Sequence, residues 1–365
     1  MKKVIVSNNG VTKQGIRYVG KTHEAIQQAI TYLKTNGGGT CFIENGTYLI
    51  TAAIQVPSNI EICGEGRYTV LRNMMLSTST GALRITSNEN VYIHDLYIES
   101  GSTSTNAAPA MYASSSITSI SDLEKYGLRI ENCIIKKHPV PPIVFESVGN
   151  AIIKNNIIDS NESSSYPAGI FLYDCVYINI CDNYITNNGN YGIEASDCSE
   201  VKVSGNIIKG NDYVGISFYD CYSSSICDNI ILNNSSYGIY LREGTMIEVS
   251  NNIISDHYNS GIYCDSIDHL IIKSNSINNN SGNGIHMEYT RLATIMGNSI
   301  ILNNSSGIQL YSCRYSHVVG NTMTRNGYYG LYISYRYDEQ ITATGNIFTD
   351  KSILGSDMDV TYNDV

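Results

Sequence analysis

Apolar residues in this chain fall on alternate positions in short runs, and turn residues separate the runs. The stretch "GIYLREGTMIEVSNNIISDHYNS" carries three such runs, centred on Ile239 and Leu241, on Ile247 and Val249, and on Ile254. Alternation with a period of two is typical of a β-strand that has one buried and one solvated face. Each such stretch therefore predicts three short strands.

The same pattern returns every 23 residues. A glycine followed by Ile or Leu opens the later copies: Gly169, Gly192, Gly215, Gly238, Gly261, Gly284, Gly307 and Gly330. Three strands that are each too short to bury their own face must stack on the next copy. We therefore predict an all-β fold, a right-handed parallel β-helix (solenoid) of about twelve 23-residue coils.

Two columns of asparagine keep the same period. The first column stands fourteen residues after each glycine except the last: Asn183, Asn206, Asn229, Asn252, Asn275, Asn298 and Asn321. The second column stands five residues further on, and His257 is its single departure: Asn188, Asn211, Asn234, Asn280, Asn303 and Asn326. Identical amides one coil apart can hydrogen-bond along the axis, so both columns predict asparagine ladders.

The ten cysteines contain no C-x-x-C pair, and several of them recur in one phase of the repeat: Cys175, Cys198, Cys221 and Cys313. Side chains that point the same way suit small buried thiols better than disulfides, whose torsion angle is close to perpendicular. We expect free, structural cysteines.

The ends of the chain differ from the repeat. The segment "THEAIQQAITYLKTNGGG" predicts a short amphipathic helix with Thr22 as N-cap, with Ile26, Ala29, Ile30 and Leu33 on one face, and with Gly37 as the stop. Such a helix would cover the open strand edges of the first coil. The predicted organisation is a segment with a capping helix at 1–40, a β-helix at 41–348 with insertions near 99–118 and 161–168, and a tail at 349–365.

Charge and hydropathy narrow the function. The net charge of -10, without a basic cluster, argues against nucleic acid. No apolar run approaches the roughly 18 residues that a membrane span needs. The first residues, "MKKVIVSNNG", lack the apolar core of a secretory signal peptide. We therefore expect a protein made in the cytoplasm, and later release or association with a virion stays open.

The stretch "GGGTCFIENGTYLITAAIQVPSNIEICGEG" and the repeated coils resemble the pectate-lyase-like superfamily of right-handed β-helices. The resemblance covers nearly the whole chain and implies a polysaccharide or oligosaccharide partner. The superfamily includes lyases, hydrolases, epimerases, phage tailspikes and non-catalytic members. The Asp-Asp and Gly-His-Gly motifs of polygalacturonases, the Asp-Pro-His-Glu of alginate epimerases and the Arg-x-Pro-x-x-Arg of pectate lyases are all missing, so no activity is carried over residue by residue.

The register of the repeat places a polar patch on the outer face. The second and fourth residues after each glycine point outward, which stacks Tyr240, Tyr263, His286 and Gln309 in one column and Arg242, Asp265, Glu288 and Tyr311 in the next.

This patch suits chemistry on a uronate sugar. Arg242 could hold the sugar carboxylate, His286 could act as base, and Tyr263 could protonate the leaving oxygen. Asp265 or Glu288 could orient the imidazole, or the two carboxylates could serve hydrolysis as acid and nucleophile. The residues expected to bind sugar rings are Tyr219, Tyr240, Gln309, Tyr311 and Tyr332. The opposing interpretation is that these side chains merely cover the outside of a β-helix.

A second patch is an acidic column at the strand-to-turn corner, formed by Asp174, Asp197, Asp220 and Glu243, which the insertions near 99–118 and 161–168 could wall. Stacked carboxylates repel one another unless they are protonated, solvated or bridged by a cation such as calcium. No metal cluster follows from the remaining histidines, which fall in different phases, and the proposed chemistry requires no cofactor.

The sequence therefore favours a glycan-binding β-helix, with a polysaccharide lyase or glycoside hydrolase first and a non-catalytic structural or attachment protein, such as a virion spike component, as the alternative. A homotrimer of parallel rods would indicate the spike, and a monomer with an open tyrosine-lined groove would indicate the enzyme.

Overall fold

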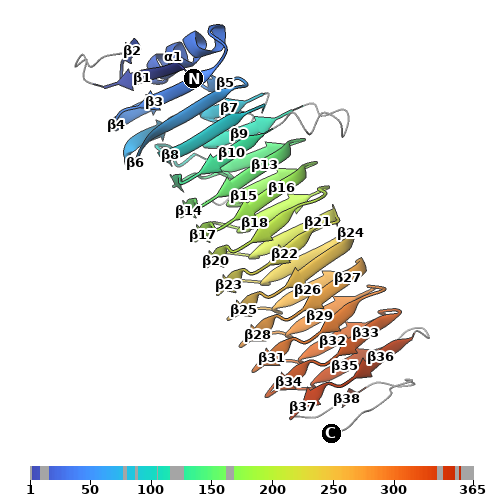
Figure 1. The fold of residues 1–365 in the computed structure, drawn as a ribbon. Coiled ribbons are helices and arrows are strands. Elements are labelled where there is room, and N and C mark those ends of the chain that lie inside the picture. Colours follow the sequence, from blue (N-terminus) through green and yellow to red (C-terminus); the bar gives the residue numbers. More distant parts are fainter. Residues whose placement is uncertain are drawn as a thin grey trace. The chain divides into compact units, whose positions relative to one another are not determined.

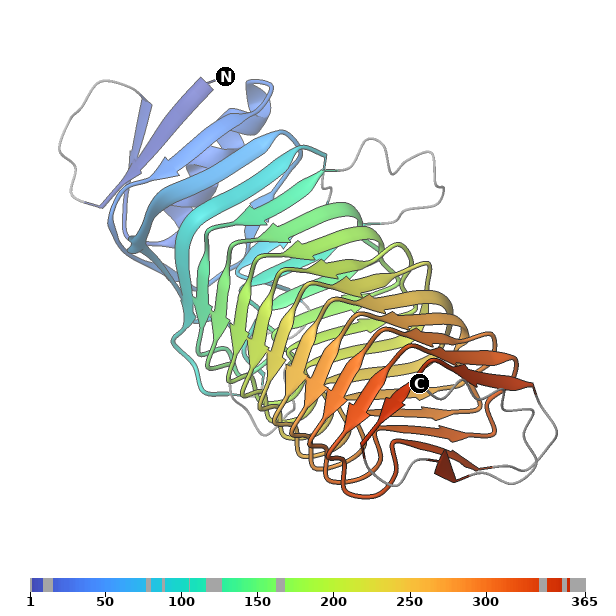
Figure 2. The same cartoon turned by 60° about the horizontal axis from the view of Figure 1, so that its bottom comes forward.

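The structure is a computed structural model that describes residues 2–8, 16–76, 80–86, 89–104, 106–115, 127–161, 168–334, 340–349 and 353–354. The chain divides into two compact units, Met1–Asn190 (unit 1) and Tyr191–Val365 (unit 2). Each unit is a stack of parallel strands, as the ribbons of Figures 1 and 2 show. The strands follow one another three to a coil, in about twelve turns, which confirms the predicted parallel β-helix.

Unit 2 keeps the 23-residue period with little variation, and its strands form three sheets. The first sheet contains β18 (Ile193–Ser196), β21 (Ile216–Tyr222), β24 (Ile239–Ser250), β26 (Ile262–Asp265), β29 (Ile285–Glu288), β32 (Ile308–Tyr311), β35 (Leu331–Ser334) and β38 (Ile353–Leu354). The second contains β19 (Lys202–Ser204), β22 (Ser225–Cys227), the end of β24, β27 (Asp268–Lys273), β30 (Thr294–Met296), β33 (Ser316–Val319) and β36 (Ile341–Thr344). The third contains β20 (Ile207–Lys209), β23 (Ile230–Leu232), β25 (Ile253–Ser255), β28 (Ser276–Asn278), β31 (Ser299–Ile301), β34 (Thr322–Thr324) and β37 (Ile347–Phe348).

Unit 1 has the same three sheets, built from less regular coils. The first contains β5 (Ile54–Val56), β7 (Leu83–Ile85), β9 (Met111–Ser114), β12 (Ile143–Glu146) and β15 (Ile170–Tyr173). The second contains β2 (Ile16–Val19), β1 (Lys2–Ser7), β3 (Gly39–Ile43), β6 (Ile60–Asn73), β8 (Val91–Ser100), β10 (Leu128–Glu131), β13 (Gly149–Lys154) and β16 (Val176–Cys181). The third contains β4 (Gly46–Ile50), the ends of β6 and β8, β11 (Ile134–Lys136), β14 (Ile157–Asp159) and β17 (Tyr184–Thr186).

The residues predicted to point inward fill the core of the coils. On β29, Ile285 and Met287 are fully buried, while His286 and Glu288 are only partly buried. Burial of one face of each strand fixes the register, because a shift by one residue would turn every apolar side chain to solvent.

Both asparagine ladders are present. Along the first column of unit 2, Asn252 donates its backbone N–H and its side-chain amide to Oδ1 of Asn275, at 2.9 and 3.0 Å, and Asn275 repeats this with Asn298. The same amide groups also reach carbonyls of the preceding coil, as from Asn275 to Val249 at 2.9 Å. The ladders thus satisfy backbone groups at buried corners that would otherwise lack partners.

All ten cysteines are free, as predicted, and eight of them are buried. In the recurring phase, the thiol of Cys221 hydrogen-bonds with that of Cys198 and with backbone carbonyls. Burial and this contact raise the pKa of the Cys221 thiol far above its usual range, so it is structural rather than nucleophilic.

The predicted N-terminal helix is α1 (His23–Thr35), which packs on β1 and β3. Its buried face contains Ile26 and Leu33, and the chain leaves the helix through Gly37 at φ +86°. Thr22 occupies the N-cap position, but its side chain makes no capping hydrogen bond. None of the described helices is long and apolar enough to cross a membrane.

The predicted insertion at 99–118 contains strand β9, and residues 116–118 lie outside the described part of the chain. Most of the insertion at 161–168 also lies outside it, so the walls expected there are not described.

Candidate functional site

The two outward columns predicted from the register lie side by side on the first sheet of unit 2. Tyr240 lies opposite Tyr263 and then His286, while Arg242 lies opposite Asp265 and then Glu288. The columns continue through Gln309 and Tyr311 on β32 to Tyr332 on β35. The structure therefore brings together the residues proposed for catalysis.

Aromatic rings form a row along the first column. Tyr240 and Tyr263 stack with ring centroids 5.3 Å apart and an interplanar angle of 10°. Tyr237, from the preceding corner, contacts both rings at 5.5 and 5.1 Å. The row ends where the edge of Tyr263 meets the ring of His286 at 5.2 Å. A sugar ring could lie on this apolar surface while its hydroxyl groups reach the polar neighbours.

His286 is the residue of this row that can move a proton. Only 19% of its side chain is exposed, and Nε2 has no hydrogen-bond partner among the described residues, although Oε1 of Glu288 lies 3.1 Å away. Burial lowers the pKa of the imidazole, and the nearby charge of Glu288 opposes this shift only in part. The imidazole is therefore neutral at physiological pH and can accept a proton.

The pKa of Tyr263 shifts upward, in the direction opposite to that of His286. Burial, followed by the negative charges of Glu288 and Asp265, raises the pKa of its phenol well above the usual range. The phenol keeps its proton at physiological pH, so beside a neutral His286 it can act as donor.

Arg242 gives the patch a positive charge. Its Nε lies 3.5 Å from Oε1 of Glu243 and 3.8 Å from Oδ2 of Asp265, and its guanidinium lies 5.7 Å from the ring centre of Tyr219. The side chain is 48% exposed, and exposed ion pairs of this kind are weak. A carboxylate of a ligand could therefore compete for the guanidinium.

A hollow of about 340 Å³ adjoins these columns, lined by Tyr191, Glu194, Ser196, Tyr213, Ser217, Tyr219, Tyr240 and Arg242. Burial raises the pKa of Glu194 to about 7, so this carboxyl group can exchange a proton near neutral pH. Glu194 is the second residue after Gly192, so the register of the repeat puts it on the outer face, but no motif in the sequence marks it. The available signal was its column, which it shares with Tyr240 and His286.

The remaining predicted sugar-binding residues are held by their neighbours. Gln309 accepts a hydrogen bond of 3.1 Å from the amide of Asn283. Tyr311 meets the ring of Tyr289 edge to face at 5.6 Å. Tyr332 stacks on Tyr329 at the same centroid distance. Aromatic surface thus continues beyond His286.

The acidic column lies at a left-handed bend of the backbone. Within unit 2, Asp197, Asp220 and Glu243 each adopt a left-handed conformation with φ of 55, 48 and 53° at the end of a first-sheet strand. Aspartate tolerates this conformation better than most residues, and solvent reaches the corner. Asp174 has the same conformation in unit 1 and accepts a 2.7 Å hydrogen bond from Ser147. The bend does not require an acid, because Ser266, Tyr289 and Ser312 adopt the same conformation in the following coils, and a calcium ion at this column stays a prediction.

Within the described part of the chain, one group of His, Cys and acidic side chains is close enough to hold a metal ion: Glu61, Cys63 and His94, in unit 1. No spacing in the sequence marks this group, because its three residues follow no common phase of the repeat.

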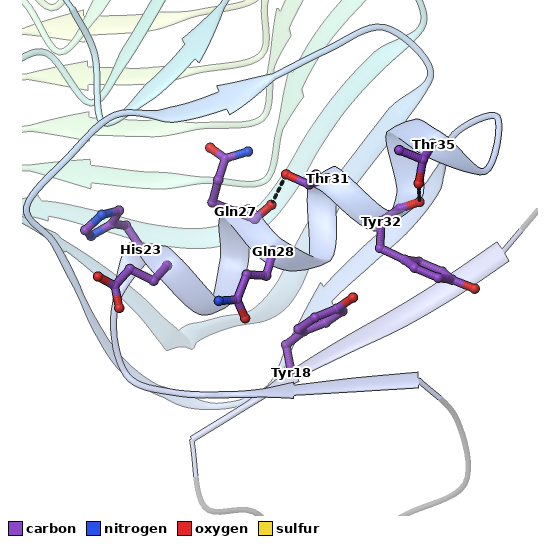
Figure 3. A pocket seen from close by; sticks show the side chains of 8 residues that line it. Tyr18, His23, Gln27, Gln28, Thr31, Tyr32 and Thr35 are labelled. Atoms are coloured by element: carbon purple, nitrogen blue, oxygen red, sulfur yellow. Dashed lines mark hydrogen bonds between the residues drawn. The ribbon is translucent and has the colours of Figure 1, made fainter.

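A larger hollow, of about 650 Å³, lies beside α1 and β2 in unit 1. Figure 3 shows Tyr18 and Tyr32 along it, with Gln28 between β2 and the helix. Its rim is polar, and Thr31 and Thr35 are tied to helix carbonyls. It offers a second surface for binding, and His23 and Glu24 are among the residues that line it.

Known proteins share this fold. The A-module of the mannuronan C-5 epimerase AlgE6 of Azotobacter vinelandii matches with 17% identity, 90% of this chain and 95% of that chain covered, and a TM-score of 0.73. The surface protein and adhesin PfbA of Streptococcus pneumoniae matches with 13% identity, coverage of 90 and 96%, and a TM-score of 0.66. The pre-mature gene product 12 of bacteriophage phi29 matches with 15% identity, coverage of 93 and 53%, and a TM-score of 0.68.

These identities show the fold alone, and the three proteins differ in what they do. No curated protein matches the sequence. The family model described as "Right handed beta helix region" matches residues 58–226, 124–266 and 238–363. Together these matches span most of the chain, which therefore belongs to the family of right-handed β-helix proteins.

Proposed function

We propose that the protein is a polysaccharide-active enzyme that acts on a carboxylate-bearing glycan along the outward columns of unit 2. One observation carries the proposal: the buried Nε2 of His286, without a hydrogen-bond partner among the described residues, lies at the end of a row of tyrosine rings. A neutral imidazole there can accept a proton from a bound ligand once the side chain of Glu288, 3.1 Å from Nε2, moves aside to give access to that nitrogen.

The substrate is chosen by charge and shape. The guanidinium of Arg242 can bind a uronate carboxylate through two parallel hydrogen bonds, and the tyrosine row supports the sugar rings. Because the whole chain carries a net charge of -10, this local cation is needed to hold a polyanion.

The reaction that best fits these groups is a β-elimination. Arg242 stabilises the negative charge that develops on the carboxylate as His286 removes the proton from the neighbouring carbon. Electrons of that C–H bond form the C=C bond, the glycosidic C–O bond breaks, and Tyr263 donates its proton to the leaving oxygen. No water is consumed and no cofactor is needed. Return of a proton to the carbon instead of bond cleavage would make the same groups an epimerase.

Hydrolysis by Asp265 and Glu288 is the second catalytic candidate, since the two residues are neighbours across β26 and β29. Oδ2 of Asp265 lies 3.8 Å from Nε of Arg242, in a weak exposed pair that either reaction would have to open, so the products formed distinguish the two candidates.

A non-catalytic glycan-binding or attachment role is the alternative. The aromatic contacts of Tyr289 with Tyr311 and of Tyr329 with Tyr332 favour it, because they extend the binding surface past the proposed base.

The test is incubation with a panel of acidic and neutral polysaccharides, read by mass spectrometry. The variant His286→Ala is compared with His269→Ala, a matched control whose histidine is 57% exposed beside Asp268. Unsaturated products without added water support elimination, and products that contain added water support hydrolysis. If a glycan is retained but not chemically changed, the protein is a glycan-binding protein and not an enzyme.

A further inference from the structure

The side chains of Glu61, Cys63 and His94 meet on the outer face of the second sheet of unit 1. Cys63 on β6 lies directly opposite His94 on β8, and Glu61 lies two residues before Cys63 on the same face. One ligand atom from each of the three lies within 4.8 Å of the other two. Nε2 of His94 is 3.1 Å from Oε1 of Glu61, and the thiol of Cys63 hydrogen-bonds with the imidazole.

A fourth residue orients the imidazole. Nδ1 of His94 lies 2.7 Å from Oδ2 of Asp95, which reaches back because its own backbone is left-handed, with φ of 53°. A carboxylate on Nδ1 leaves Nε2 directed toward Glu61 and fixes the ring. This is the arrangement by which carboxylates support histidines that bind metal through the other nitrogen.

The surroundings hold the three ligands in place. Tyr92 stacks on the imidazole with centroids 4.1 Å apart, and its hydroxyl donates to Glu131 at 2.8 Å. Thr40 donates to the second oxygen of Glu61. Cys63 is 8% exposed, so its sulfur is shielded from bulk solvent. The cluster is thus partly enclosed and anchored on three adjacent strands, β3, β6 and β8.

The chain also departs from its regular coil at this point. The pairing of β6 with β8 shifts register between Cys63 and Gly66 and again before Val70. Gly64 has no room for a side chain, since an added Cβ would lie 2.6 Å from that of Thr69. Irregular pairing of this kind redirects side chains and is frequent beside functional sites.

We propose that Glu61, Cys63 and His94 form a binding site for a single transition-metal ion, preferentially Zn²⁺, with Asp95 as the residue that orients His94. One sulfur, one nitrogen and one oxygen ligand suit zinc better than calcium or magnesium, which prefer oxygen alone. Tetrahedral zinc needs ligand atoms roughly 3.5 Å apart, and the present cluster spans 3.1 to at most 4.8 Å, so only a small rearrangement is required. Three protein ligands would leave a fourth position open to water or to a ligand.

The test is calorimetric titration of the metal-stripped full chain with Zn²⁺, paired with Co²⁺ absorption spectroscopy. We expect one ion per chain and a thiolate-to-cobalt charge-transfer band in the near ultraviolet. Cys63→Ser should remove that band, and His94→Gln should weaken zinc binding by at least about tenfold. Asp95→Asn should weaken it by about 10- to 100-fold while keeping the band, because the sulfur ligand remains.

Two variants serve as matched controls. Cys227→Ser removes a partly buried thiol that lies beside Asp228, and His269→Gln removes a histidine beside Asp268. Both should bind zinc as the unmodified chain does.

The proposal is wrong if the unmodified chain shows no thiolate-to-cobalt band, or if the controls lose zinc as strongly as the site variants. Because the spectrum of the unmodified chain is decisive by itself, a variant that fails to fold does not rescue the proposal.

Discussion

His257 is fully buried and His286 partly buried in unit 2, and burial lowers the pKa of both, yet their surroundings differ. His257 stands in an asparagine column, where Nδ1 accepts the N–H of Asn234 and Nε2 lies 3.1 Å from the carbonyl of Ile231. His286 stands on the outer face, and its Nε2 has no hydrogen-bond partner among the described residues. The two partnered nitrogens of His257 tie it to the fold, whereas Nε2 of His286 lacks the partner that buried polar atoms usually have, and the proposed function supplies one in a bound ligand.

The largest expected difference between the two histidines is in catalytic activity. If the glycan is processed, His286→Ala should reduce kcat/KM by about 10²- to 10⁴-fold, because a positioned base contributes that much. His257→Asn should leave kcat/KM unchanged, since His257 faces the ladder. Steady-state kinetics of both variants, with thermal unfolding to verify the fold, checks this. Equal losses in the two variants would remove the distinction between the two histidines.

Stability against pH separates the histidines in a different way. Burial lowers the pKa of His257 to about 4, against 6.5 when it is unfolded. Above pH 6.5 neither state binds the proton and the full stability is present. Between pH 6.5 and 4 only the unfolded state binds the proton. The free energy of unfolding therefore decreases by up to ~3 kcal/mol as the pH falls through this range. Denaturant unfolding from pH 7 to 4 should show this loss, reduced in His257→Asn. A pH profile identical in the variant would show that His257 is not the titrating group.

The variant Arg242→Lys tests whether Arg242 binds the carboxylate of a glycan in the outward columns of unit 2. Lysine keeps the charge but cannot form two parallel hydrogen bonds, so KM for an acidic glycan should rise about tenfold with little change in kcat. The kinetics with a neutral glycan of the same length provide the control. An unchanged KM would mean that the carboxylate is bound elsewhere.

The smallest effect concerns the ladder itself. Oδ1 of Asn234 accepts two hydrogen bonds from Asn211, but its Nδ2 has no partner among the described residues, because the imidazole of His257 offers a single acceptor, which the backbone N–H of Asn234 occupies. His257→Asn would supply the Oδ1 found at other rungs and should stabilise the protein by about 1 kcal/mol. Chemical denaturation at pH 7 measures the change. Destabilisation instead would show that packing of the imidazole outweighs the missing hydrogen bond.

The fold follows from the sequence because one short pattern is repeated. Gly284, Ile285 and Asn298 stand in the same phase as their counterparts in each neighbouring coil, so period, strand number, inward face and ladder can all be read directly. The columns around His286 follow from the same register. The amphipathic pattern also predicts the N-terminal helix, although the side chain of Thr22 makes no capping hydrogen bond.

The features that were missed depend on local packing rather than on the repeat. The pKa of Glu194 is raised to about 7 because its carboxyl group is largely buried, in a hollow that Tyr191 and Tyr213 also line. Cys63 and His94 are 31 residues apart and meet across a pairing with shifted register. Contacts of this kind cannot be predicted from the spacing of residues in the sequence.

The asparagine ladder also bears on how such a chain can change its length during evolution. Each rung receives hydrogen bonds from one neighbour and gives them to the next, through the same atoms each time. Removing or duplicating one 23-residue period in unit 2 would therefore rejoin equivalent partners. Extra residues in a bend are also tolerated, because Asn321 reaches Oδ1 of Asn346 through the same atoms across 25 residues. Duplication of a whole coil thus lengthens the molecule and adds one residue to each surface column.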